Sequence, residues 1–146
     1  MAADPNEVMV NVVGVFEQQP NPSHQQPRSH VLILRDPINR ELHVPIGSCE
    51  GLAIDVVLEQ HLVARPLTHD LALRVLEKLS AKLERVVIDD VAGDASAATL
   101  HLTSSEGEIT IAARPGDAVA LAVRAEAPIY ATEDVLARAG QPDEGT

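Results

Sequence analysis

The sequence predicts an α+β fold in which an antiparallel or mixed, strongly curled sheet packs around a buried helix. Segments with strand periodicity occur in runs interrupted by a few helical segments, which favours α+β over strict alternation of strands and helices. Residues 115–126 are apolar on all helical faces, which indicates a buried helix. The chain has 146 residues, a length that fits a single domain over residues 1–146.

Three strands are expected in the first third of the chain. Valines alternate with other residues over 7–15, which predicts a strand that is buried on at least one face. Residues 17–28 are rich in Gln, Pro, Asn and Ser, so we expect a flexible solvent loop there. Residues 30–35 and 41–46 predict a hairpin, because the Asp-Pro-Ile-Asn-Arg segment between them carries residues that suit a turn.

Two helices are expected over residues 48–61 and 68–81. In the first, Ser48 can act as the N-cap, and Leu52 and Val56 lie on an apolar stripe. In the second, apolar residues recur at helical spacing with polar residues between them, which gives the clearest helical pattern in the chain.

The C-terminal half is expected to hold a three-stranded meander, the buried helix, a short strand and a last helix. In order, these cover residues 84–91, 97–103, 108–113, 115–126, 128–131 and 133–139. Thr132 can cap the last helix, which ends at Gly140. The polar tail 141–146 is expected to be frayed.

The charge of the protein argues against a role in coating polyanions. Acidic residues number 22 against 11 basic ones, which gives a net charge of −11. Long-range attraction to nucleic acid should therefore be absent or local, so nucleic acid is a possible partner that the net charge disfavours. Only Phe16 and Tyr130 are aromatic, which argues against single-strand binding by base stacking.

The sequence predicts a cytoplasmic protein that does not enter a membrane. The first residues contain neither a basic region nor the apolar core of a signal peptide. The longest uncharged apolar run, 118–123, is far shorter than the roughly 20 residues that a membrane span needs. The single cysteine, Cys49, cannot form an internal disulfide, and we expect a small buried residue there.

Two helix starts carry the same short pattern, in which Arg-Pro precedes the helix and an Asp lies in its first turn. Arg65 and Asp70 form one copy, and Arg114 and Asp117 form the other. Free backbone N–H groups and the positive end of the helix dipole make such a start a potential phosphate site with the arginine as a clamp. Alternatively, the aspartates satisfy those N–H groups themselves, and the arginines pair with carboxylates to hold the loops.

His69 is a candidate acid or base in the first turn of the second helix. Neighbouring helical residues point about 100° apart, so His69 and Asp70 cannot form a dyad with each other. A partner for His69 must therefore come from another segment. The other five of the six histidines lack the spacing of zinc ligands, so a structural zinc site is not expected.

Five blocks in a specific order resemble the bifunctional nuclease domain family. They are Val44-Pro45-Ile46, residues 47–54, 65–71 and 113–124, and Ala127-Pro128-Ile129-Tyr130. The resemblance runs from about Val8 to Gly140. It implies a compact α+β domain of a family in which DNase and RNase activity has been ascribed to some members.

The resemblance also implies a set of site residues. The polar set of the family falls on Glu50, Arg65, Thr68, His69, Asp70, Arg114, Asp117 and Arg124. One hypothesis is a weak phosphodiesterase assisted by Mg²⁺ or Mn²⁺. Its catalytic residues would be His69, Asp70 and Asp117, its substrate-binding residues Arg65, Thr68, Arg114 and Arg124, and its metal ligands Glu50, Asp70 and Asp117.

Three departures from the family pattern support a second hypothesis, a non-enzymatic interaction or regulatory domain. Ile46 is followed directly by Gly47, without the aromatic and aliphatic residues usual in the family. Ala95-Ser96 stands where the family usually has an aromatic pair, and Gly116 stands where it has a serine. These changes remove a hydroxyl donor and a stacking surface.

The apolar helix also predicts a homodimer. A chain of this size can cover a helix with two apolar faces only if its sheet curls around it. Otherwise an exposed apolar patch would remain, and a second copy of the chain is expected to bury it.

Overall fold

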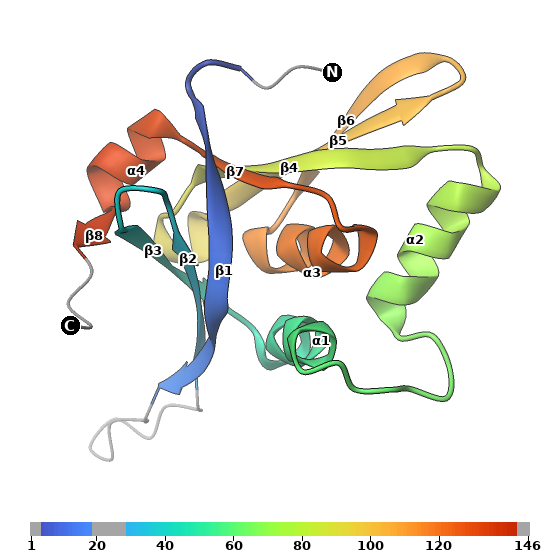
Figure 1. Ribbon diagram of the computed structural model, residues 1–146, viewed down its shortest axis with the longest axis horizontal. Helices are drawn as coiled ribbons and strands as arrows, with labels where there is room; N and C mark the ends of the chain where they lie inside the picture. The colour runs from blue at the N-terminus through green and yellow to red at the C-terminus, as the bar shows by residue number, and fades with distance from the viewer. Residues whose placement is uncertain (1–3, 19–28, 143–146) are drawn as a thin grey trace.

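The computed structural model describes residues 4–18 and 29–142, which form one open mixed sheet with four α-helices (Figure 1). The strands are β1 (Glu7–Gln18), β2 (Ser29–Arg35), β3 (Arg40–Ile46), β4 (Lys82–Asp90), β5 (Ala97–Ser104), β6 (Gly107–Ala113), β7 (Ile129–Thr132) and β8 (Gln141–Pro142). The helices are α1 (Ser48–Leu58), α2 (Thr68–Lys78), α3 (Pro115–Ala125) and α4 (Glu133–Ala139), with a short 3-10 helix at Gly93–Ala95. The α+β class is confirmed.

The strand order in the sheet is β6-β5-β4-β7-β1-β2-β3-β8. Strands β4, β5 and β6 form the predicted antiparallel meander, and β2 and β3 form the predicted hairpin. Strand β7 lies between the two groups, parallel to β4 and antiparallel to β1. The sheet is therefore mixed, and β7 joins its two halves.

Helix α3 is buried, as its apolar residues predict. Ala118, Val119, Ala120 and Ala122 have no exposed surface. Strands β3, β4 and β5 contact α3, and so do helices α1 and α2, which lie beside it in Figure 1. Because two helices share the covering of α3, its burial does not require a strongly curled sheet. It also does not require a second copy, so the reason given for a homodimer is wrong.

Helix α1 packs through a different face from the one predicted. Its buried residues are Gly51, Ala53 and Ile54, whereas Leu52 is 64% exposed. Small residues face inward because α1 approaches its neighbours closely: a Cβ atom on Gly51 would lie 3.3 Å from Val15 Cγ1. Helix α1 also ends at Leu58, earlier than expected, and its N-cap is Gly47 rather than Ser48. Cys49 is exposed, so the expectation of a buried cysteine is wrong.

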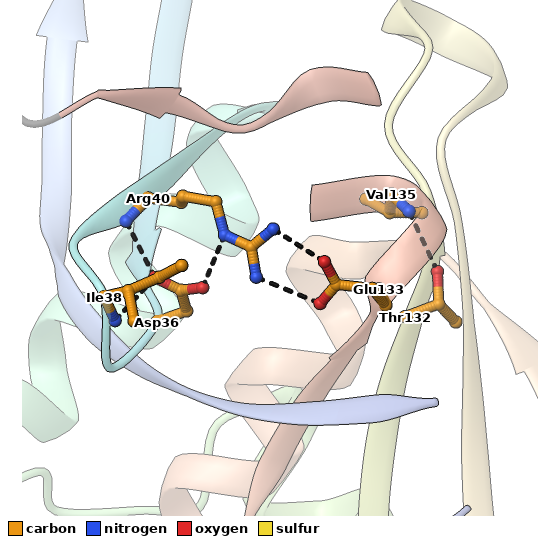
Figure 2. Close-up of polar contacts among 6 residues, drawn as sticks. All are labelled: Asp36, Ile38, Arg40, Thr132, Glu133 and Val135. Atoms are coloured by element: carbon orange, nitrogen blue, oxygen red, sulfur yellow. Dashed lines mark hydrogen bonds and ion pairs between the residues drawn. The ribbon is translucent and has the colours of Figure 1, made fainter. Parts of the chain in front are cut away.

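The start of α4 is fixed by two contacts (Figure 2). Thr132 Oγ1 accepts a hydrogen bond of 3.1 Å from the Val135 N–H, which confirms the predicted cap. The Arg40 guanidinium donates to both carboxylate oxygens of Glu133, at 2.8 and 3.0 Å. The same guanidinium donates through Nε to the buried Asp36 carboxylate at 2.7 Å. Arg40 thus ties the β2–β3 turn to α4.

Two of the segments expected to lack regular structure are partly ordered. Glu17 and Gln18 belong to β1, which corrects the prediction of a loop from residue 17, and the rest of that prediction, residues 19–28, lies outside the described residues. At the other end, Gln141 and Pro142 pair with β3 as β8, which corrects the prediction of a tail frayed from 141. Residues 143–146 also lie outside the described part. No helix in the described ranges has the length and apolar content of a membrane span.

Candidate functional site

The fold brings the two Arg-Pro helix starts together. His69 in the first turn of α2 forms a hydrogen bond of 2.9 Å, from Nε2 to Asp117 Oδ1 in the first turn of α3. The His69 side chain is 13% exposed, and that of Asp117 is 44% exposed. This contact confirms that the partner of His69 comes from another segment rather than from Asp70.

The His69–Asp117 contact fixes the roles of the two imidazole nitrogens. An ionised carboxylate can only accept hydrogen bonds, so Nε2 carries the ring proton and donates a hydrogen bond to Asp117. In the neutral ring Nδ1 then has a free lone pair and can accept a proton. No second hydrogen bond to the His69 ring occurs within residues 4–18 and 29–142. The pair therefore has the arrangement of an oriented general base.

Asp70 has a different environment from Asp117. Its Oδ2 accepts a hydrogen bond of 2.9 Å from the Leu67 N–H at the start of α2, and its Oδ1 accepts one of 2.8 Å from Arg124 Nε. Burial alone would raise the pKa of the Asp70 carboxyl, but the Leu67 N–H and Arg124 outweigh it, so the pKa is lowered. Asp70 thus accepts a hydrogen bond from a free N–H at the start of its helix, as expected if the aspartates satisfy these groups themselves. Both of its carboxylate oxygens have hydrogen-bond partners.

The side chain of Arg124 reaches back along α3 and is 5% exposed. Besides the bond to Asp70, its Nη1 donates to the Ala120 carbonyl at 2.9 Å. Its Nη2 is buried without a hydrogen-bond partner among the described residues. Arg124 therefore holds α2 against α3 and retains an unused pair of donor hydrogens.

Arg65 and Arg114 are both exposed and have no ion pair within the described ranges. The alternative prediction, in which these arginines pair with carboxylates to hold the loops, is therefore wrong for Arg65 and Arg114. Each lines a separate cavity. Arg65 lies in a cavity of about 340 Å³ beside α2 and the end of α3. Arg114 lies in a cavity of about 500 Å³ beside the start of α3.

The larger cavity also contains Glu50, which lies against the first turn of α3. A Cβ atom on Gly116 would lie 3.0 Å from Glu50 Cβ and 3.0 Å from Ile46 Cγ2. His30 and His43 line the same cavity. Thr68 is the first residue of α2 and is exposed, but neither cavity lining includes it.

The three carboxylates expected to hold a metal ion do not form one cluster. Glu50 lines the larger cavity, Asp70 is bonded to Arg124, and Asp117 is bonded to His69. Within the described residues, no group of three or more His, Cys, Asp or Glu side chains has an arrangement that could hold a metal ion. A Mg²⁺ ion needs only one or two protein carboxylates, and half-exposed Asp117 and the cavity-lining Glu50 are the members of the set that remain accessible to one.

Sequence reasoning did not single out four titratable residues that line the cavities: Arg74, Glu77, His30 and His43. A signal for Arg74 was present, because it lies four residues after Asp70 and shares its helical face. His30 and His43 come from neighbouring strands, and nothing in their spacing indicated that they face the start of α3.

Comparisons with known proteins identify the family of the chain. The model of the bifunctional nuclease domain matches residues 32–144. Two relatives from Mycobacterium tuberculosis are "Uncharacterized protein MT1877" of strain CDC 1551 / Oshkosh and "Uncharacterized protein Rv1829" of strain ATCC 25618 / H37Rv. Each is 40% identical over 139 residues, which covers 92% of this chain and 79% of the relative. The chain belongs to the bifunctional nuclease domain family.

Proposed function

We propose that this protein hydrolyses phosphodiester bonds of DNA or RNA at the His69–Asp117 pair. The observation that carries the proposal is the 2.9 Å contact between the two helix starts, which orients His69 as a base. Two exposed arginines without ion pairs in the described part, Arg65 and Arg114, precede the same two helices. Membership of the bifunctional nuclease domain family supports this class of reaction.

In the proposed reaction His69 Nδ1 takes a proton from a water molecule, whose oxygen attacks the phosphorus atom. The P–O bond to the leaving nucleotide breaks, the leaving oxygen takes a proton from a solvent water molecule to become an alcohol, and His69 then returns its proton to the solvent. Asp117 keeps the imidazole in the required tautomer and stabilises the imidazolium that forms. Arg114 offsets the charge of the phosphate at the N-terminus of α3, and Thr68 can donate its hydroxyl to a phosphate oxygen.

Asp70 and Arg124 take a positioning role in this proposal. Their contact holds the first turn of α2 against α3, and it thereby sets where His69 meets Asp117. A divalent cation, Mg²⁺ or Mn²⁺, would supply charge neutralisation at the phosphate. Asp117 and Glu50, both near the start of α3, are the carboxylates that could help to hold it.

The test is cleavage of single-stranded RNA and single-stranded DNA with Mg²⁺, with Mn²⁺ and with a chelator. We expect His69→Ala and Asp117→Asn to lower the cleavage rate at least about 100-fold, the effect of losing a general base. Arg138→Ala is the control, because it removes an exposed arginine on α4. Cleavage that survives unchanged in His69→Ala would contradict the proposal, and the chelator arm decides the role of the cation.

A second candidate, a non-enzymatic binding domain, is favoured by one observation. The linings of the two cavities include neither His69 nor Asp117, so the pair lies outside both of them. This candidate predicts a protein that binds a ligand in a cavity and cleaves neither nucleic acid under any of the metal conditions.

The homodimer also remains a proposal, and α2 offers a surface for it. Leu71, Val75 and Leu79 form an exposed apolar stripe at spacings of four residues. A dimer through this stripe predicts a mass of twice 15.6 kDa in light scattering under reducing conditions, and it predicts a monomer mass for Val75→Glu. A monomer mass for the unaltered protein would contradict it.

A further inference from the structure

The 340 Å³ cavity is formed by the segment before α2, one face of α2 and the end of α3. Three of its lining residues are arginines: Arg65, Arg74 and Arg124. Two are carboxylates, Asp70 and Glu77. The cavity therefore carries one excess positive charge in a protein whose net charge is −11. Local positive charge in an acidic protein indicates a specific anion rather than general attraction to polyanions.

Only some of the charged side chains in the cavity form ion pairs with one another. Both oxygens of Asp70 are already bonded, one of them to Arg124 Nε. Arg65 and Arg74 have no ion pair within the described ranges. Two guanidinium groups thus remain available to a ligand, and their planar donors match the oxygens of a phosphate or carboxylate.

Arg124 adds a second, independent observation. Its side chain is 5% exposed, yet its Nη2 donors have no partner in the described part of the chain. A buried unsatisfied donor is costly and unusual in a native protein, since most such groups have a partner. An oxyanion in the cavity would provide the acceptor that the described residues do not supply.

The remaining walls are apolar and come from Val63, Ala64, Pro66 and Leu73. A bare ion would leave these surfaces facing water. The volume lies at the lower end of the range found for small-molecule sites, about 300–1,000 Å³. The combination of an arginine cluster and an apolar wall fits a ligand that has a charged end and an organic body.

We infer that this cavity binds a small phosphate monoester, with the phosphate among Arg65, Arg74 and Arg124 and the organic part against Pro66 and Leu73. The choice of a nucleotide as the ligand rests on the proposed function, because phosphodiester hydrolysis leaves a phosphate monoester at the end of a nucleic-acid product. Asp70, which lines the cavity, directly follows His69 in α2.

Isothermal titration calorimetry tests this inference with four probes: nucleoside 5′-monophosphate, nucleoside 3′-monophosphate, the unphosphorylated nucleoside and inorganic phosphate. We expect at least one monophosphate to bind at least tenfold more tightly than the nucleoside and than inorganic phosphate. Equal affinity for a monophosphate and the nucleoside would overturn the inference. Inorganic phosphate binding as tightly as the monophosphates would overturn the assignment of a monoester.

Variants locate the site. Arg65→Ala and Arg74→Ala should each weaken monophosphate binding at least about tenfold, as the loss of a charge-assisted hydrogen bond implies. Arg138→Ala removes the same charge from α4 outside the cavity and should leave binding unchanged. Losses no larger than those of this control would overturn the inference. Arg65 and Arg74 are exposed, so these variants should fold.

The same experiment separates this inference from the proposed function. His69→Ala should lose cleavage but keep monophosphate binding, because the cavity lining does not include His69. Monophosphate binding in a protein that cleaves no nucleic acid would refute the hydrolysis and leave the cavity assignment standing. Cleavage without monophosphate binding would refute the cavity assignment alone.

Discussion

Removing the Asp70 carboxylate should destabilise the protein by about 3 kcal/mol. Asp70→Ala leaves the Arg124 guanidinium, 5% exposed, without its anion. Breaking a fully buried pair costs about 3–5 kcal/mol, but the Asp70 side chain is 31% exposed, which reduces this part to about 2 kcal/mol. The lost hydrogen bond from the Leu67 N–H adds about 1 kcal/mol.

Urea denaturation followed by circular dichroism measures this loss as a change in the free energy of unfolding. Asp70→Asn is the matched control, because it keeps the shape and a hydrogen-bond acceptor for the Leu67 N–H, while it loses the charge and the acceptor for Arg124 Nε. We expect it to cost about 2 kcal/mol. The double variant Asp70→Ala with Arg124→Met removes both charges, and it should cost at least about 1 kcal/mol less than the sum of the single variants. A cost below about 1 kcal/mol for Asp70→Ala, or strict additivity, would refute the reasoning.

Two further predictions concern pH and packing. The pKa of Asp70 is lowered in the folded state, so its contribution to stability is present above the unfolded value of about 3.9 and is lost as the pH falls through the folded value. The stability difference between the unaltered protein and Asp70→Asn should therefore shrink when urea titrations move from pH 6 to below pH 3.9. Gly116→Ala places a Cβ atom 3.0 Å from Glu50 and Ile46, and urea titration should show a loss of about 1–3 kcal/mol. Unchanged stability would mean that α1 shifts away from the added methyl group at little cost in free energy.

Most elements of the fold could be predicted because their patterns are local. The strand alternation around Val10, the turn before Arg40 and the cap at Thr132 depend on neighbouring residues only. The inward face of α1 could not be predicted from large apolar residues, since close packing puts Gly51 inside and leaves Leu52 exposed. The pairing of β8 with β3 joins residues about a hundred positions apart and has no periodic signal.

The candidate site was predictable as a set of residues but not as a set of contacts. The Arg-Pro pattern marked both helix starts, and the family resemblance added Arg124. That His69 bonds to Asp117 while its neighbour Asp70 bonds to Arg124 depends on how α2 crosses α3. This crossing is a tertiary property. The sequence showed only that His69 and Asp70 point in different directions and need separate partners.

The position of β7 has a consequence for how the chain is made. Strand β7, residues 129–132, pairs with both β1, near the N-terminus, and β4. Neither of these strands therefore has its second neighbour in the sheet until residues 129–132 have left the ribosome. Until then each half of the sheet presents a bare edge, and bare edges pair readily with other chains. Truncation before Ile129 would therefore yield two aggregation-prone half-sheets rather than a shortened version of the fold.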